Sequence, residues 1–321
     1  WEVCSPETVS QFSAVGYFFA RKLHQELGIP IGIINSSWGG TGVESWTSGD
    51  TFNKLPQQYR DSYKNVDASN LGKLIKEKSK SVGPNTYYSL LYNGMIYPII
   101  QFSIRGAIWY QGEHNASQAY NYRTLFPTLI NDWRAKWGYE FPFYWVQLAN
   151  FMAKNDEPQE SDWAKLREAQ TMNLSLPQTA EAVITDIGEA RDIHPRNKQD
   201  VGLRLALNAL NKTYGKDKVV YSGPTFKSVE ITGNKAIISY NHIGGGLVCR
   251  SKYGYIEGFA VSGADKKFYW AKAYIDGDKV IISSDKVTNP VYVRYSWANN
   301  PDVNLFNTEG LPAAPFRTDV E

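Results

Sequence analysis

Helical and strand-like segments alternate along the first two thirds of the chain, and this alternation restricts the fold more than any other feature. Apolar residues recur at helical spacing in some segments, and short apolar runs typical of buried strands lie between them. The expected helices cover 9–27, 122–137, 163–174 and 195–210, and the expected strands cover 29–34, 106–110, 143–148 and 182–185. This order predicts an α/β fold of three layers, in which helices cover both faces of a parallel sheet.

The pattern changes after about residue 219, where short alternating runs replace the helices. The expected strands are 226–231, 236–240, 269–275, 279–283 and 291–295, with glycine-containing turns at 232–234 and 276–278. We therefore expect an α/β domain over residues 1–215 and a smaller antiparallel, sandwich-like β region over residues 216–321. Residues 51–84 are polar and lysine-rich, and we expect an excursion with one helix over the surface or along a cleft.

Composition disfavours several classes of function. The 321 residues are 42% hydrophobic, and 34 basic against 32 acidic residues give a net charge of +2 without a basic stripe, so nucleic-acid binding is not expected. No apolar run approaches the ~18 residues that a membrane span needs. Cys4 and Cys249 are far apart and have no histidine partner nearby. This spacing predicts neither a zinc site nor a disulfide framework, although it leaves one long-range disulfide open.

Polar clusters follow three of the expected strands. Segments 35–42, 111–116 and 186–194 each begin close to where such a strand ends. Ligands of open parallel sheets gather at the carboxyl ends of the strands, where loops lift side chains out of the core. We therefore expect these three segments to form one site.

The third of these segments contains a histidine just before a helix. Asp192 and His194 precede Pro195, which is expected to open that helix. A histidine in such a loop can exchange protons near neutral pH, while a neighbouring carboxylate orients the ring and stabilises the imidazolium. A helix-capping aspartate followed by a surface histidine is an equally good interpretation of this stretch alone.

The first segment is rich in glycine. Gly39 and Gly40 allow backbone N–H groups to point into a cleft, where they can stabilise an oxyanion or hold a phosphate. A phosphate site needs a GxxxxGK[ST] or GxGxxG pattern, and the sequence contains neither. The remaining alternative is a tight turn that needs positive φ angles.

Three segments together resemble the sialate O-acetylesterases, a family of the SGNH-hydrolase superfamily. They are Asn35-Ser-Ser-Trp-Gly-Gly-Thr41 with Glu44-Ser-Trp46, Trp109-Tyr-Gln-Gly-Glu-His-Asn-Ala116, and Asp192-Ile-His-Pro-Arg-Asn-Lys198. Segments 290–298 and 309–319 are also similar to the C-terminal part of that family, so the resemblance covers nearly the whole chain. It implies an SGNH-hydrolase-like fold for the α/β domain.

The resemblance implies that His194 is the general base and that Asp192 is its carboxylate neighbour. Many members of the superfamily place the acid three residues before the histidine, where this chain has Arg191. Glu113 is therefore a rival for the carboxylate that orients the His194 ring. Either carboxylate would hold the ring tautomer and stabilise the imidazolium as it forms.

The same resemblance assigns the groups that bind the substrate. Gly39 or Gly40 would donate backbone N–H groups to the oxyanion, and Gln111 and Asn115 belong to the third family block, with Asn115 facing the oxyanion. His114 stands where the family usually has serine. We expect that change to tune the site and not to abolish it.

The nucleophile is the point at which the sequence departs from the family. The family carries its serine in a Gly-Gln-Ser-Asn block upstream of the segment that begins here, and these 321 residues contain no such block. Three accounts remain: the serine lies on an N-terminal segment or second chain preceding Trp1, Ser36 or Ser37 replaces it, or the chain is inactive. We favour the first, and we expect the sheet to lack a strand and to expose an unpaired edge.

The resemblance implies a serine-type ester hydrolase that removes O-acetyl groups from a sugar, in the first place 9-O-acetyl sialic acid. An acetylxylan esterase is the alternative within the enzyme class, and an inactive carbohydrate-binding module is the alternative outside it. Neither a metal nor an organic cofactor is expected, and the expected partner is an O-acetylated sugar.

Four glycosylation sequons bear on location. They lie at Asn35, Asn115, Asn173 and Asn211, and the first two fall in the expected site, where a glycan would block the cleft. An unglycosylated bacterial protein of the periplasm, or a secreted one, therefore fits the sequence better than a glycosylated lysosomal protein.

Overall fold

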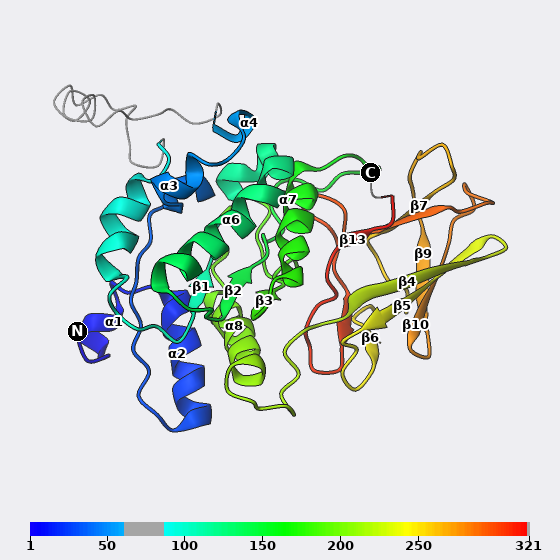
Figure 1. Cartoon of the computed structure of the whole chain (residues 1–321). Helices are drawn as coiled ribbons and strands as arrows, with labels where there is room; N and C mark the ends of the chain where they lie inside the picture. Colours follow the sequence, from blue (N-terminus) through cyan, green and yellow to red (C-terminus); the bar gives the residue numbers. More distant parts are fainter. Residues whose placement is uncertain (61–86, 320–321) are drawn as a thin grey trace.

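The computed structural model describes residues 1–60 and 87–319, which form α/β layers beside a group of antiparallel strands (Figure 1). The helices are α1 (Pro6–Val9), α2 (Ala14–Leu27), α3 (Gly49–Phe52), α4 (Gln57–Arg60), α6 (Ala119–Trp137), α7 (Asp162–Thr171) and α8 (Lys198–Lys212), with short turns η1 (Val43–Trp46), η3 (Tyr92–Ile96), η4 (Tyr97–Ile99), η5 (Glu113–Gln118) and η6 (Met172–Ser175). The excursion expected over 51–84 is described only as far as residue 60, and its remainder lies outside the described residues.

Three parallel strands form the sheet of the α/β part. They are β1 (Ala107–Trp109), β2 (Phe143–Val146) and β3 (Thr179–Ala182), in the order β1-β2-β3. Side chains of β2 alternate between two cores, as the period of a strand requires. Phe143 and Trp145 pack with the cluster of α6 and α7, whereas Tyr144 and Val146 pack with α2 and α8 on the other face. This arrangement confirms the predicted three-layer α/β fold.

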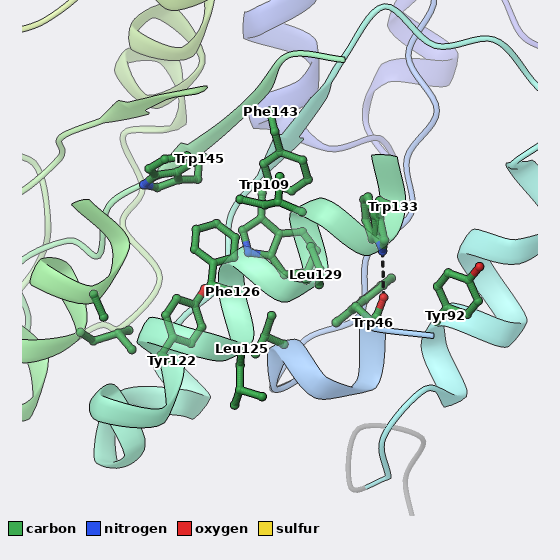
Figure 2. Packing of buried hydrophobic residues seen from close by; sticks show 14 of the residues in the cluster. Trp46, Tyr92, Trp109, Tyr122, Leu125, Phe126, Leu129, Trp133, Phe143 and Trp145 are labelled. Atoms are coloured by element: carbon green, nitrogen blue, oxygen red, sulfur yellow. Dashed lines mark hydrogen bonds between the residues drawn. The ribbon is translucent and has the colours of Figure 1, made fainter. Parts of the chain in front are cut away.

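Aromatic side chains dominate the core on the α6 face. Trp109 lies at its centre, with the rings of Trp46 and Trp133 packed edge-on at centroid distances of 5.9 and 5.8 Å. The indole N–H of Trp133 donates to the carbonyl oxygen of Trp46 over 2.9 Å, so a polar group of this core has a partner (Figure 2). The cluster thereby anchors η1 to α6 and to β1.

The expected strand 29–34 differs from the prediction. Ile31 and Ile33 pack against the cluster of α2 and α8, but residues 29–34 belong to no sheet. Burial of apolar side chains does not make a strand, because a strand also needs a neighbour for its backbone groups. Among the described residues no such neighbour lies beside this segment.

The strand expected over 182–185 lies earlier, since β3 ends at Ala182. Residues 183–185 are buried but extend past Val146, where β2 ends. The helix expected from Pro195 begins at Lys198, with Asn197 as its N-cap residue. Asp192 is therefore not a helix cap, which removes one of the two interpretations of that stretch.

Antiparallel strands make up the second region and confirm the predicted change of pattern. They are β4 (Thr225–Thr232), β5 (Lys235–Asn241), β6 (Leu247–Cys249), β7 (Phe259–Ser262), β8 (Tyr269–Trp270), β9 (Lys272–Asp276), β10 (Lys279–Ser283), β11 (Tyr292–Tyr295), β12 (Leu305–Asn307) and β13 (Phe316–Arg317). Their sheets have the orders β4-β5-β10-β9, β13-β11-β7-β8 and β12-β6. Gly233 and Gly277 adopt φ angles of 59° and 58° at the two predicted turns. The domain boundary at 215–216 stays a prediction.

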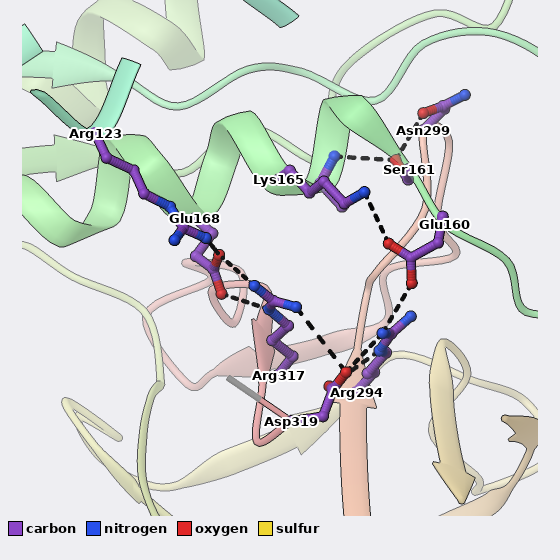
Figure 3. A network of polar contacts seen from close by, with 10 residues as sticks. Arg123, Glu160, Ser161, Lys165, Glu168, Arg294, Asn299, Arg317 and Asp319 are labelled. Atoms are coloured by element: carbon purple, nitrogen blue, oxygen red, sulfur yellow. Dashed lines mark hydrogen bonds and ion pairs between the residues drawn. The ribbon is translucent and has the colours of Figure 1, made fainter. Parts of the chain in front are cut away.

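Buried polar contacts join the two parts of the chain. Arg167 of α7 is fully buried and donates to backbone oxygens of Leu148 and Ala149, next to β2, and of Ala298 and Asn299, beyond β11. A second set of contacts links α6 and α7 to the C-terminal strands through Arg123, Glu160, Lys165, Glu168, Arg294, Arg317 and Asp319 (Figure 3). These contacts fix the β region against α7.

Three further findings concern the described part of the chain. None of its helices combines the length and the apolar character that crossing a membrane requires. Nor does this part contain a group of three or more His, Cys, Asp or Glu side chains that could hold a metal ion. Cys4 and Cys249 are both free thiols.

Glu181 of β3 is a buried carboxyl group among neutral donors. Its oxygens accept from the Thr171 hydroxyl at 3.0 Å and from the Trp145 indole at 3.3 Å. Burial raises the pKa of Glu181 to about 7, although these hydrogen bonds act in the opposite direction. The protonated form is therefore favoured in the folded state, so stability from this group is present at low pH and is lost as the pH rises from about 4.5 to 7.

We predict that Glu181→Gln flattens the pH dependence of stability. Between pH 4.5 and 8, the free energy of unfolding should decrease less in the variant than in the native chain. The difference between the two decreases should be on the order of 3 kcal/mol. Urea unfolding at a series of pH values measures this. Glu230→Gln, on the exposed face of β4, is the matched control and should leave the curve unchanged. An unaltered curve for Glu181→Gln would contradict the assignment.

Candidate active site

A cavity of about 840 Å³ lies beside β1 and beyond its carboxyl end. Most of its walls come from segments 33–41, 108–114 and 193–198, which overlap the three polar clusters. The structure brings five of the predicted site residues onto these walls: Gly39, Gly40, Gln111, Glu113 and His194. Asp192 and Asn115 are not on the walls, and each contacts a residue that is.

His194 lies in the loop between β3 and α8, with its side chain 85% exposed. The backbone N–H of His194 donates to Oδ1 of Asp192 over 2.9 Å, and the ring atom Nδ1 lies 3.5 Å from the same oxygen. Asp192 thus sits beside the ring as the sequence resemblance implies. Because the pair is exposed, water competes with this contact in the free protein.

Glu113 enters the cavity from the other side, at the start of η5. The preceding residue, Gly112, has a φ angle of 152°, and a Cβ atom there would meet Leu166 at 2.8 Å. Only glycine fits such a position, so the sharp turn after β1 directs Glu113 to the cavity. Burial raises the pKa of Glu113, whereas its own backbone N–H, Lys198 and His194 act to lower it.

Lys198 is a wall residue to which the sequence analysis assigned no role. Its ammonium group lies 4.9 Å from the centroid of the Tyr110 ring, and its side chain is half-buried. Burial lowers the pKa of Lys198, and the carboxylates of Glu113 and Asp192 act to raise it. The sequence could have indicated Lys198, because it is the last residue of the third segment that carries the family resemblance.

The glycine loop forms the opposite wall. Gly39 and Gly40 are exposed, and Gly40 has a φ angle of 68°, a conformation that side chains other than glycine disfavour. The loop is followed by Thr41, whose hydroxyl donates to the carbonyl oxygen of Trp38 over 3.1 Å and accepts from the Trp46 indole over 2.9 Å. These contacts attach the C-terminal side of the loop to the aromatic core.

Asn115 is not among the residues that line the cavity. We expected it to face the oxyanion, but its amide N–H groups donate to both carboxylate oxygens of Glu44, over 3.1 and 3.0 Å. Only 2% of Asn115 is exposed. Glu44 is fully buried, and the Asn115 amide supplies donors that replace water at its carboxyl group. Gln111, by contrast, lies on the cavity wall and donates to the backbone oxygen of Thr41 over 2.8 Å.

Ser36 and Ser37 also lie on the cavity wall. The Ser36 hydroxyl donates weakly to the Met95 carbonyl oxygen at 3.5 Å, and the Ser37 hydroxyl donates to Asn35 over 3.0 Å. Within the described residues, neither hydroxyl forms a hydrogen bond with His194. Neither serine therefore has the contact with a base that would activate it in this structure.

Comparison with known proteins identifies the class first. A family model described as "Carbohydrate esterase, sialic acid-specific acetylesterase" matches residues 5–211. The chain therefore belongs to this family of carbohydrate esterases, as the resemblance of its three segments predicted.

The particular relatives agree with that family. The chain is similar to human sialate O-acetylesterase, with 31% identity over 337 residues that cover 95% of this chain and 60% of the relative. The mouse enzyme is 33% identical over 265 residues, which cover 72% of this chain and 48% of the relative. A crystal structure of a carbohydrate acetylesterase from Xanthomonas citri superposes with a TM-score of 0.87 and 44% identity, and it covers all of this chain and 68% of the other. The chain thus spans about half to two thirds of the length of these relatives.

We predict that Lys198→Met raises the pKa of Glu113 further, because the substitution removes the positive charge that favours the Glu113 carboxylate. Lys198→Arg keeps the charge and should leave that pKa close to its native value. Titration of the ¹³C-labelled Glu113 carboxyl group by NMR measures both variants. Equal values in the two variants would show that Lys198 does not act on Glu113.

Proposed function

We propose that this protein hydrolyses carboxylic esters by a serine-type mechanism and removes O-acetyl groups from a sugar. The preferred candidate substrate is 9-O-acetyl sialic acid. The observation that carries the proposal is one cavity, in a chain of the sialic acid-specific acetylesterase family, whose walls hold a histidine, a half-buried carboxyl group and a glycine loop. A serine would attack the acetyl carbonyl, backbone N–H groups would hold the tetrahedral intermediate, and water would release acetate.

Acetate release from 9-O-acetyl sialic acid and from acetylated xylan tests the proposal. Faster release from the sialic acid ester, expressed as kcat/KM, supports it. Faster release from xylan would favour the acetylxylan esterase alternative. Binding of an acetylated sugar without any release of acetate would instead favour the inactive binding module.

His194 is proposed as the general base. We predict that His194→Ala leaves the thermal unfolding midpoint within about 1 °C, because the side chain is 85% exposed, while kcat falls by orders of magnitude. His114→Ala is the matched control, since that exposed histidine also lies on the cavity wall. If the control loses as much activity as His194→Ala, or if His194→Ala stays within a few-fold of the native rate, the assignment fails.

Asp192 is proposed as the carboxylate that orients the His194 ring, because its Oδ1 lies 3.5 Å from Nδ1. Asp192→Asn should therefore lower kcat more than Glu113→Gln does, through loss of tautomer control and without loss of the fold. Steady-state kinetics of the two variants, beside their unfolding midpoints, measure this difference. A larger loss of kcat in Glu113→Gln would transfer the role to Glu113.

The nucleophile is proposed to come from a strand outside these 321 residues. Within the described residues β1 pairs with β2 alone, so its other edge faces the cavity, and segment 33–36 lines the opposite wall. One more parallel strand inserted there would pair with β1 and would end close to Gly39, Glu113 and His194. An N-terminal segment or a second chain could supply this strand, with the serine at its carboxyl end.

We also propose a periplasmic or secreted location without N-glycans. Of the four sequon asparagines, Asn115 and Asn173 are only 2% and 3% exposed, so a glycan on either is incompatible with the folded chain. Asn35 lies on the cavity wall. Intact-mass measurement of the protein from its source tests this proposal, and N-glycan mass on Asn35 would contradict it.

A further inference from the structure

Glu44 is a fully buried carboxylate that the sequence analysis noted only as part of a motif. It lies in η1, two residues before Trp46, and both its oxygens accept from the Asn115 amide group over 3.1 and 3.0 Å. A carboxylate in the interior is tolerated only where donors replace the water that it has lost. The pairing of Glu44 with Asn115 therefore contributes to the stability of this buried carboxyl group.

The oxygen atom of the Asn115 amide also has hydrogen-bond partners. Its Oδ1 atom accepts from the backbone N–H of Val43 over 3.0 Å and from the Gln111 side chain over 2.7 Å. The amide nitrogen thus contacts both oxygens of Glu44, and the amide oxygen is shared by two partners, which fixes the plane of the group. Asn115 is only 2% exposed and is not among the residues that line the cavity.

Gln111 continues the same chain of contacts. Its Nε2 atom donates to the Thr41 carbonyl oxygen over 2.8 Å, and its Oε1 atom accepts from the Tyr122 hydroxyl over 3.0 Å. The contacts therefore run from Glu44 through Asn115 and Gln111 to Thr41, and a branch reaches Val43. Both ends lie on the segment 41–44, directly after the glycine loop.

The glycine loop depends on this anchor. Gly39 and Gly40 have no side chains that could hold them, and an added Cβ atom would meet nothing within 4 Å at either position. Their conformation must therefore be set from outside the two residues. The segment 41–44 is the nearest one with buried partners, since Thr41, Val43 and Glu44 are at most 5% exposed.

We propose that Glu44 is a positioning residue of the candidate esterase site, which acts through Asn115 and Gln111 to hold the Gly39–Gly40 backbone in the geometry that binds an oxyanion. Asn115 is part of this link and is not itself a donor to the oxyanion. The inference rests on the proposed ester hydrolysis, because it assigns the glycine loop its role in that reaction.

Glu44→Gln tests the proposal. A glutamine presents one NH₂ group to the Asn115 amide, so one of the two hydrogen bonds is lost while size and shape are kept. In the active protein, kcat should fall by about tenfold to a hundredfold while KM stays within about threefold, since the loop would act on the transition state and not on ground-state binding. A KM increase with kcat unchanged would overturn the proposal.

Asp132→Asn is the matched control. Asp132 is a buried carboxylate, 3% exposed, that accepts from the backbone and hydroxyl of Ser48 and from the Thr51 hydroxyl, beyond the segment 41–44. This variant should lower the unfolding midpoint as Glu44→Gln does, but kcat should stay within about threefold. Equal losses of kcat would show that general destabilisation, and not the loop, is responsible.

A double-mutant cycle separates the two roles of Asn115. If Glu44 acts through Asn115, then Glu44→Gln combined with Asn115→Ala should lower kcat no further than the more damaging single variant. Losses that multiply would show that Asn115 contacts the oxyanion independently, which would overturn the proposal.

Hydrogen exchange distinguishes failure of this proposal from failure of the proposed function. In the 321-residue chain, Glu44→Gln should accelerate amide exchange in a peptide covering 39–44, and Asp132→Asn should not. If the native protein releases no acetate from any substrate, the proposed function fails, and unchanged exchange in Glu44→Gln would overturn the positioning role separately. If Glu44→Gln does not fold, Glu44→Asp replaces it, because the shorter carboxylate cannot keep both contacts.

Discussion

The backbone of a parallel strand carries hydrogen-bonding groups on both edges, and these groups need partners wherever water is excluded. Within the described residues, β1 has β2 on one edge and a cavity on the other. Parts of the three polar segments line this cavity. Residues 29–34, apolar and partly buried, remain outside the sheet.

The walls of the cavity are held by buried contacts and not by local propensity. On one side, the pairing of Asn115 with Glu44 and of Gln111 with Thr41 attaches the glycine loop to η5. On the other side, Arg167 and the ion pairs of α7 fix the helix that packs against η5 to the C-terminal strands. The antiparallel region thus acts on the site indirectly, as a support for α7.

Much of the fold follows from patterns within short stretches of sequence. The buried apolar run of β2 and the glycine turns at 233 and 277 are local features, and the structure has them where the sequence predicts them. That residues 29–34 pair with no strand among the described residues was not predictable in this way, because pairing depends on a neighbour that periodicity does not reveal. The predicted start of α8 contains a smaller error. The helix was expected from Pro195, but Asn197 is its N-cap residue.

The candidate site, like the fold, was predictable from the sequence only in part. The family segments identify the loops that reach the cavity, including those of His194, Glu113 and Gly39. They do not show that the Asn115 amide pairs with a carboxylate 71 positions away in sequence, because that contact arises only when η1 and η5 pack together. Lys198 lies at the end of the third family segment, but its position over the Tyr110 ring, 88 positions away in sequence, is visible only in the folded chain.

The central claim is that the catalytic serine belongs to a strand that fills the gap beside β1. Labelling of the protein, as isolated from its source, with a serine-directed fluorophosphonate tests it most directly, once the labelled peptide is identified by mass spectrometry. The account predicts one labelled serine on a peptide outside these 321 residues, and no label when His194 is replaced by Ala. Label on Ser36 or Ser37, in a sample that contains only these 321 residues and releases acetate, would contradict it.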